Sequence, residues 1–187
     1  MHRIIPFLMI MMFSAACTGG GGDNVPVPKP VAYPRIDTLP QEYTSAGGLK
    51  INKGAEIVTD SLFADGTRWI TVDYPKYQAS LYISEVPVAK GGMEAAVENR
   101  TERMALNSGG NPGELISFMA KGYDIRLLVT PRHSSHPVQL LAVNPAANRI
   151  ITATAVLNNP AAIQNPDSVA PVIDALKADI TSLLKDD

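Results

Sequence analysis

The feature that most constrains the fold is a series of four short apolar segments joined by turns. The segments span 115–120, 123–129, 138–143 and 149–157, and apolar residues such as Ile125, Leu127 and Val129 recur at every second position. A period of two predicts strands with one buried face. The separators Lys121-Gly122, PRHSSHP and NPAAN are short and rich in turn residues, which favours an antiparallel meander.

The chain before this meander predicts three more strands and a helix. A short strand is expected at 55–59, and alternating patterns predict strands at 68–74 and 79–86, joined through the hairpin connection YPKY. The apolar spacing of Met93, Ala96, Val97, Arg100 or Thr101, and Met104 predicts a helix over 93–107, stopped by the glycines at 109–110.

A second, clearer helix is expected near the C-terminus. Its apolar residues lie on one stripe at helical spacing: Val169, Val172, Ile173, Leu176, Ile180, Leu183 and Leu184. Asp167 or Ser168 is the expected N-cap, which would leave Pro171 in the first turn. The order strands, helix, strands, helix predicts an α+β fold, with an antiparallel sheet covered by helices on one or both faces.

The N-terminus has the layout of a secretory signal peptide. Two basic residues precede the apolar run 4–13, which is far shorter than the roughly 20 residues that a spanning helix needs. Ser14-Ala15-Ala16-Cys17 follows, and this order resembles the bacterial lipobox. We therefore expect cleavage before Cys17 and acylation of its thiol, since two or three acyl chains anchor a protein stably and one does not. An incidental cysteine in an ordinary signal peptide is the alternative.

Composition separates the rest of the chain into a tether and one domain. Glycines 19–22 and the prolines up to residue 34 indicate a flexible, extended leader, and no strand or GK[ST] sequence supports a phosphate loop. We expect a signal peptide over 1–16, a lipidated tether over 17–31 and a globular domain over 32–187. The formal net charge of −2 and the scattered basic residues argue against nucleic acid as a partner.

No pattern predicts an active site. His133 and His136 lack a third metal ligand, and the neighbouring serines 134 and 135 lack the G-x-S-x-G context of a nucleophile. A solvated face is the better interpretation of the glutamates at 94, 98 and 102. Packing is favoured over ligand stacking for Trp69, Tyr74, Tyr77 and Tyr82. We predict no catalytic residue, no cofactor and no metal, and therefore no enzyme.

Three stretches together resemble a known family. They are PKPVAYPRIDTLP at 28–40, YPKYQASLYIS at 74–84 and NPDSVAPVIDALKADITSLL at 165–184. Placed after a lipobox, they resemble the gliding motility-associated lipoproteins of the GldD type from Bacteroidota. The resemblance implies an accessory role in the gliding or type IX secretion apparatus, or in a related envelope assembly. The element order also resembles the Mog1/PsbP-like α/β/α sandwich.

These observations lead to one functional expectation and one alternative. We expect a non-catalytic lipoprotein on the periplasmic side of the outer membrane, whose partners are the membrane and envelope proteins. A periplasmic small-ligand binder or an unrecognised hydrolase is the alternative. The D-[S/T]-aliphatic pattern marks Thr38, Ser61 and Ser168 as candidate O-glycosylation sites, although Ser168 can instead serve the helix start.

A docking segment is the last candidate. Tyr33, Arg35 and Asp37 stand where the tether ends, and we expect them to lie along the domain, with Arg35 paired to Asp37 and Tyr33 partly buried. A continuation of the flexible linker is the alternative interpretation.

Overall fold

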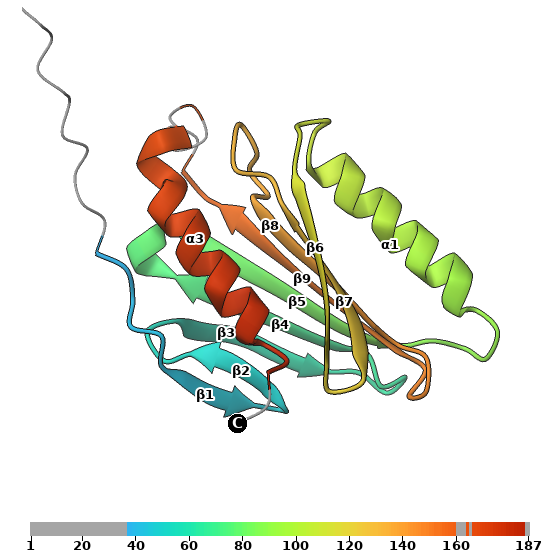
Figure 1. The fold of residues 1–187 in the computed structure, drawn as a ribbon. Helices are drawn as coiled ribbons and strands as arrows, with labels where there is room; N and C mark the ends of the chain where they lie inside the picture. Colours follow the sequence, from blue (N-terminus) through green and yellow to red (C-terminus); the bar gives the residue numbers. More distant parts are fainter. Residues whose placement is uncertain (1–36, 160–163, 165, 186–187) are drawn as a thin grey trace, which may run out of the picture. The chain divides into compact units, whose positions relative to one another are not determined.

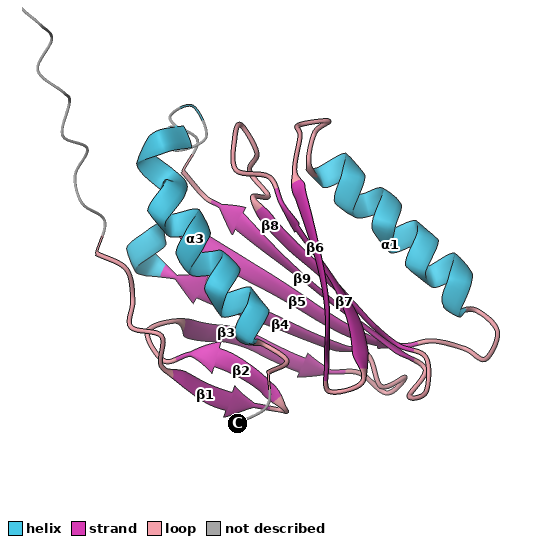
Figure 2. Ribbon diagram, viewed as in Figure 1, coloured by secondary structure: helices cyan, strands magenta, loops and turns pink. Residues whose placement is uncertain are grey.

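A computed structural model describes residues 37–159, 164 and 166–185 (Figure 1). Its main sheet has seven antiparallel strands in the order β3-β4-β5-β9-β8-β7-β6, and a separate sheet pairs β1 with β2. The helices are α1 (Met93–Asn107) and α3 (Pro166–Ser182), with a short 3-10 helix at Pro75–Tyr77 (Figure 2). The strands are β1 (Tyr43–Ala46), β2 (Leu49–Asn52), β3 (Glu56–Leu62), β4 (Arg68–Tyr74), β5 (Ala79–Pro87), β6 (Glu114–Ala120), β7 (Tyr123–Val129), β8 (Val138–Asn144) and β9 (Arg149–Leu157).

The sheet consists of two meanders that meet at its centre. The chain runs through β3, β4 and β5, crosses by α1 to the far edge, and returns through β6, β7, β8 and β9. Strand β9 then pairs with β5 along its whole length, from Ala79 opposite Leu157 to Pro87 opposite Arg149. The predicted α+β class and the antiparallel meander are confirmed.

Helices cover both faces of the sheet. One face, called the α3 face, buries Val72, Leu81, Ile125, Leu140 and Ala153 in a single core with residues of α3. The other face, called the α1 face, buries Leu141, Val143 and Ile150 with Met104 of α1. Because side chains alternate along a strand, Leu140 and Leu141 point to opposite helices.

The stripe of α3 is buried as predicted, but the start of the helix differs. All seven residues of the stripe are buried. However, α3 begins at Pro166, so Asp167 and Ser168 lie in its first turn and Pro171 lies inside the helix. The prediction that Asp167 or Ser168 caps the helix is wrong, since both residues lie within the helix.

The β1–β2 hairpin was not expected from the sequence. Gly47 and Gly48 form its two-residue turn with φ values of 56° and 85°, which is the backbone of a type I′ turn. The hairpin contributes Leu49 and Ile51 to the core on the α3 face. The backbone N–H of Lys50 donates to the carbonyl of Leu183 over 3.0 Å, which ties the hairpin to the chain after α3.

None of the helices among the described residues is long and apolar enough to cross a bilayer.

Candidate functional site

A polar groove lies beside α1 on the α1 face of the sheet. It encloses about 570 Å³ between the helix and the strands β4, β5, β9 and β8. We call it the α1 groove; its polar and aromatic lining is Trp69, Ser84, Asn99, Arg100, Arg103, Asn107, Gln139, Thr152 and Thr154.

Strand register builds the floor of the α1 groove. Trp69, Ser84 and Thr152 stand directly opposite one another on three adjacent strands. Tyr82, Thr154 and Gln139 form the next row on the same face. Opposed side chains in a sheet have Cβ atoms about 5 Å apart, so hydroxyl and amide groups lie at regular, short intervals along each row.

The wall of the groove is an exposed flank of α1, beside the helix residues that pack on the sheet. Asn99, Arg103 and Asn107 follow one another at a spacing of four and therefore share a helix face. Gln139 holds this wall in place, because its amide donates to the Met104 carbonyl over 3.1 Å and accepts from Asn107 over 3.0 Å. Gln139 is 1% exposed, so these bonds form inside the protein.

The electrostatics of the groove favour an anion. Its lining includes Arg100 and Arg103 and no aspartate or glutamate. Within the described chain neither arginine has a carboxylate partner, and the hydrogen bond found for Arg100 goes to the Ala96 carbonyl over 3.3 Å. Burial lowers the pKa of Arg100, and the like charge of Arg103 lowers it further. A bound anion would relieve this repulsion between the two guanidinium groups.

Trp69 lines the groove, and two further exposed aromatic residues lie near it. Trp69, Tyr82 and Phe63 are 57%, 50% and 45% exposed. Phe63 meets Trp69 edge-on, with 5.1 Å between the ring centroids. Tyr82 is diagonal to Trp69 in the β4–β5 register, a separation of about 7–8 Å that long side chains reach across.

The four aromatic residues singled out in the sequence divide between the two faces. Tyr74 and Tyr77 are buried on the α3 face and stack, with ring centroids 5.8 Å apart. The predicted packing role is therefore confirmed for these two tyrosines. Trp69 and Tyr82 are exposed on the α1 face and remain available for stacking on a ligand.

The other candidate residues stay apart from the groove lining. Glu94, Glu98 and Glu102 are exposed on α1, which confirms a solvated face. His133 is exposed on the β7–β8 loop, and His136 Nδ1 lies 2.9 Å from Ser135 Oγ. The described residues contain no group of three His, Cys, Asp or Glu side chains placed to hold a metal ion.

The structure describes only some of the residues that we predicted to be modified or to form the docking segment. Thr38, Ser61 and Asp37 are exposed, whereas Ser168 is half-buried in the first turn of α3. Cys17, Tyr33 and Arg35 lie outside the described residues, so the expected pair of Arg35 and Asp37 stays a prediction. The chain does lie along the domain just after this segment, because the Leu39 N–H donates to the Tyr77 hydroxyl over 2.6 Å.

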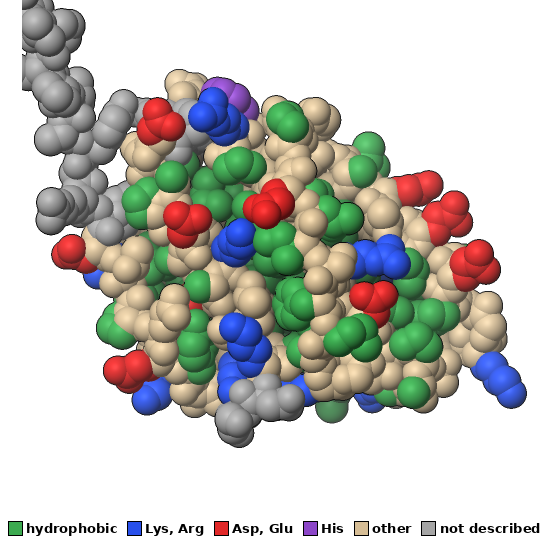
Figure 3. Space-filling view, viewed as in Figure 1, with side chains coloured by type: hydrophobic (Ala, Val, Ile, Leu, Met, Phe, Trp, Pro, Cys, Tyr) green, Lys and Arg blue, Asp and Glu red, His purple; other side chains and the backbone are tan. Residues whose placement is uncertain are grey.

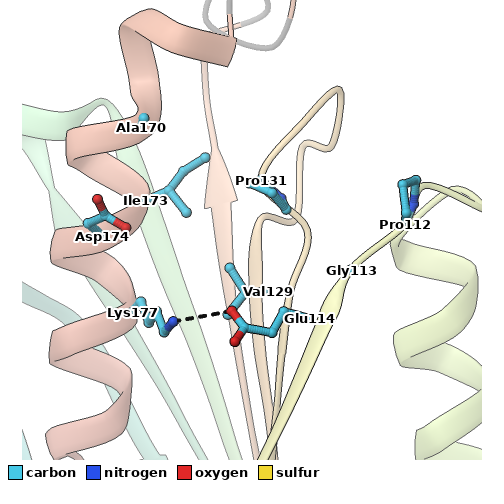
Figure 4. A pocket seen from close by; sticks show the side chains of 9 residues that line it. All are labelled: Pro112, Gly113, Glu114, Val129, Pro131, Ala170, Ile173, Asp174 and Lys177. Atoms are coloured by element: carbon cyan, nitrogen blue, oxygen red, sulfur yellow. Dashed lines mark ion pairs between the residues drawn. The ribbon is translucent and has the colours of Figure 1, made fainter.

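A second cavity, of about 370 Å³, lies between α3 and the edge strand β6. Figure 3 shows hydrophobic side chains on this side of the molecule, with charged groups among them. Ala170, Ile173 and Val129 line the cavity, and Lys177 pairs with Glu114 across it over 3.5 Å (Figure 4). Because this lysine already has a carboxylate partner, the cavity is less suited to an anionic ligand than the α1 groove.

A buried carboxylate lies where the β1–β2 hairpin meets α3. Asp179 Oδ1 accepts hydrogen bonds from Asn52 over 3.1 Å and from the Tyr43 hydroxyl over 3.0 Å. Its other oxygen, Oδ2, is buried without a hydrogen-bond partner among the described residues. Burial raises the pKa of Asp179, although the hydrogen bonds from Asn52 and Tyr43 lower it. Asn52 also donates to the Pro40 carbonyl over 3.0 Å, so this cluster fastens the N-terminal segment, the hairpin and α3 together.

Comparison with known proteins gives no relative. No family model matches the chain, and neither a curated protein nor a solved structure matches it.

Sequence reasoning missed the α1 groove, although one signal was present. Arg100 occupies a position on the apolar stripe of a helix, where a charged residue is unusual. In the structure Arg100 is half-buried and Thr101 is exposed, so the arginine is the member of that stripe. An arginine on a sheet-facing stripe indicates a polar cavity beneath the helix.

Proposed function

We propose that the protein is a lipid-anchored, non-catalytic binding protein of the cell envelope, which holds an anionic ligand in the α1 groove. The observation that carries this proposal is that Arg100 and Arg103 line one groove with the hydroxyl-bearing residues Ser84, Thr152 and Thr154. Guanidinium groups form strong, directional hydrogen bonds with carboxylates and phosphates, and neighbouring hydroxyls add further donors.

The chemistry of the lining supports binding more than catalysis. Indole, amide, hydroxyl and guanidinium groups orient and neutralise a ligand, whereas a hydrolase needs a nucleophile activated by a base. The contact between Ser135 and His136 is of that type, but it lies outside the groove lining. No carboxylate contacts this histidine within the described part of the chain, so the hydrolase alternative lacks the group that would orient its base.

The lipid anchor and the α1 groove have separate roles in the proposed function. The lipobox-like Cys17 would fix the protein to the membrane, and the tether would carry the groove away from the lipid surface. The periplasmic face of the outer membrane remains our proposed location. The accessory role in motility or type IX secretion remains what the resemblance implies, with the groove as the feature that would engage an envelope component.

Replacing Cys17 with serine tests the anchor. The Cys17→Ser protein is expected to lack its acyl chains and to move from the membrane fraction to the soluble fraction, because serine is a much weaker nucleophile than a thiol. Fractionation and intact-mass measurement report the two effects separately. A Cys17→Ser protein that stays in the membrane fraction and partitions into detergent contradicts the anchor.

Neutralising both groove arginines tests the binding site. The detergent-solubilised protein is expected to bind trigalacturonate or poly-L-glutamate at low salt, with a change in the fluorescence of Trp69, the only tryptophan of the chain. The double variant Arg100→Gln/Arg103→Gln is expected to bind about tenfold or more weakly, since a hydrogen bond to a charged group contributes roughly 1.5–3 kcal/mol.

Arg132 provides the matched control for this experiment. It is exposed on the β7–β8 loop and does not line the groove, so Arg132→Gln makes the same arginine-to-glutamine change elsewhere and removes one positive charge. Arg132→Gln is expected to bind as the wild type does. Absence of binding to either anion, or equal losses in the double variant and in Arg132→Gln, contradicts the proposed function.

A further inference from the structure

We propose that the ligand of the α1 groove is an acidic saccharide, whose rings stack on Trp69 while Arg100 and Arg103 hold its carboxylate groups. This inference rests on the proposed function and specifies the chemical class of the ligand. It depends on three properties of the α1 face: its exposed aromatic rings, its hydroxyl rows and the location of two arginines that have no carboxylate partner among the described residues.

The aromatic rings form a platform that the fold leaves uncovered. Helix α1 packs over Leu141, Val143 and Ile150, on the β8–β9 side of the sheet, and leaves Trp69 and Tyr82 of β4 and β5 exposed. On the opposite face of the same two strands, Ile70, Val72 and Leu81 are buried in the core. Large exposed rings beside a polar groove are suited to a ligand with flat apolar surfaces and polar edges, which is the character of a sugar ring.

The hydroxyl rows favour a saccharide over a simple anion. Ser84, Thr152 and Thr154 line the groove, and Thr71 is opposite Tyr82 in the row next to Trp69. A hydroxyl group both donates and accepts hydrogen bonds, as sugar hydroxyls do, whereas a phosphate or carboxylate without attached hydroxyls only accepts. A floor of groups that both donate and accept hydrogen bonds is therefore matched to a polyhydroxylated ligand.

The two arginines add the requirement for negative charge. Both line the groove that Trp69 also lines, so one ligand can contact the indole and the guanidinium groups together. A guanidinium group forms two parallel hydrogen bonds with a carboxylate, which fixes the orientation of that group. A saccharide with carboxylates on successive rings would satisfy both arginines and the aromatic platform at once.

Three compounds test separately whether the ligand needs sugar rings and whether it needs negative charge: trigalacturonate, maltotriose and poly-L-glutamate. Trigalacturonate has sugar rings and carboxylates, maltotriose has rings without charge, and poly-L-glutamate has carboxylates without rings. By calorimetry at fixed salt, the wild-type protein is expected to bind trigalacturonate more tightly than either of the others. Trp69→Ala is expected to weaken trigalacturonate binding about fivefold or more, and to weaken poly-L-glutamate binding by a clearly smaller factor.

Met119→Ala is the control variant for lost apolar surface. Met119 lies on the same sheet face at the far edge strand β6 and is 69% exposed. The Met119→Ala protein is expected to bind all three compounds as the wild type does. Circular dichroism checks that the Trp69→Ala and Met119→Ala proteins are folded.

The results that overturn the saccharide differ from those that overturn the proposed function. Two results would contradict the saccharide as the ligand and leave an anion-binding protein. One is that poly-L-glutamate binds as tightly as trigalacturonate. The other is that the Trp69→Ala variant binds trigalacturonate like the wild type. If maltotriose binds as tightly as trigalacturonate, the ligand does not need a negative charge, and the inference of an acidic saccharide is wrong. Tighter binding of a thymidine oligonucleotide than of trigalacturonate would identify single-stranded nucleic acid as the ligand class instead. If neither trigalacturonate nor poly-L-glutamate binds, the proposed function fails as well.

Discussion

Replacing Leu176 with alanine is expected to lower the free energy of unfolding by about 2–5 kcal/mol, the cost of deleting most of a buried leucine side chain and leaving a cavity. Leu176 is 0% exposed on α3 and belongs to the core that joins this helix to the sheet. Because domains are stable by only about 5–15 kcal/mol, this one substitution removes a large share of the stability. Urea unfolding followed by circular dichroism measures the change.

Leu106 provides the matched control for this loss. It carries the same side chain on α1 and is 77% exposed, so Leu106→Ala is expected to change stability by no more than about 0.5 kcal/mol. Equal effects of the two substitutions would mean that α3 does not pack on the sheet as described.

Replacing Asn52 with leucine is expected to lower the free energy of unfolding by about 2–4 kcal/mol at neutral pH. The substitution removes the hydrogen bonds that Asn52 donates to the Asp179 carboxylate and to the Pro40 carbonyl, and the one that its Oδ1 accepts from the Gly54 N–H. A hydrogen bond to a charged group contributes roughly 1.5–3 kcal/mol and a neutral one roughly 0.5–1.5 kcal/mol. Asn99→Leu is the control, because Asn99 is exposed on α1. This substitution is expected to leave the free energy of unfolding nearly unchanged.

The loss caused by Asn52→Leu is expected to depend on pH. Burial raises the pKa of folded Asp179 above the ordinary value of 3.8, and the hydrogen bond from Asn52 opposes that rise. Removing this bond raises the pKa of folded Asp179 further, so ionisation above pH 3.8 destabilises the variant more than the wild type. The difference in stability should therefore be smallest at low pH, where Asp179 is protonated in both states and the bond to Pro40 is the main loss, and should grow as the pH rises above the pKa of Asp179 in the folded wild type. A difference that shrinks as the pH rises above that value would contradict the role given to Asp179.

The elements whose apolar residues repeat regularly were predictable from the sequence. Strands β4, β7 and β9 and helix α1 have the expected bounds, because their apolar residues repeat at the period of the element. The β1–β2 hairpin escaped notice since only one of its strands is buried, although Gly47-Gly48 between YTSA and LKIN is a recognised hairpin signal. The predicted start of α3 was too late in the chain, because Asp167 and Ser168 are common N-cap residues but lie within the helix here.

The groove was not predictable because it depends on register between distant strands. Ser84 and Thr152 become neighbours only through the pairing of β5 with β9, which the chain reaches after three intervening hairpins and a helix. Likewise, Trp69 and Arg100 line one cavity only because α1 packs on the same face as the indole. Each residue alone has an ordinary alternative interpretation, and the combination appears only in three dimensions.

The most direct test of the α1 groove as an anion-binding site is a titration of the isotopically labelled protein with trigalacturonate, followed by nuclear magnetic resonance. The indole N–H of Trp69 gives one signal, since the chain has a single tryptophan, and the guanidinium Nε–H signals report Arg100 and Arg103. We predict that these three signals shift most, together with the backbone amides of Ser84 and Thr152. Shifts centred on the cavity lined by Ile173 and Lys177, or no shifts at all, would contradict the account.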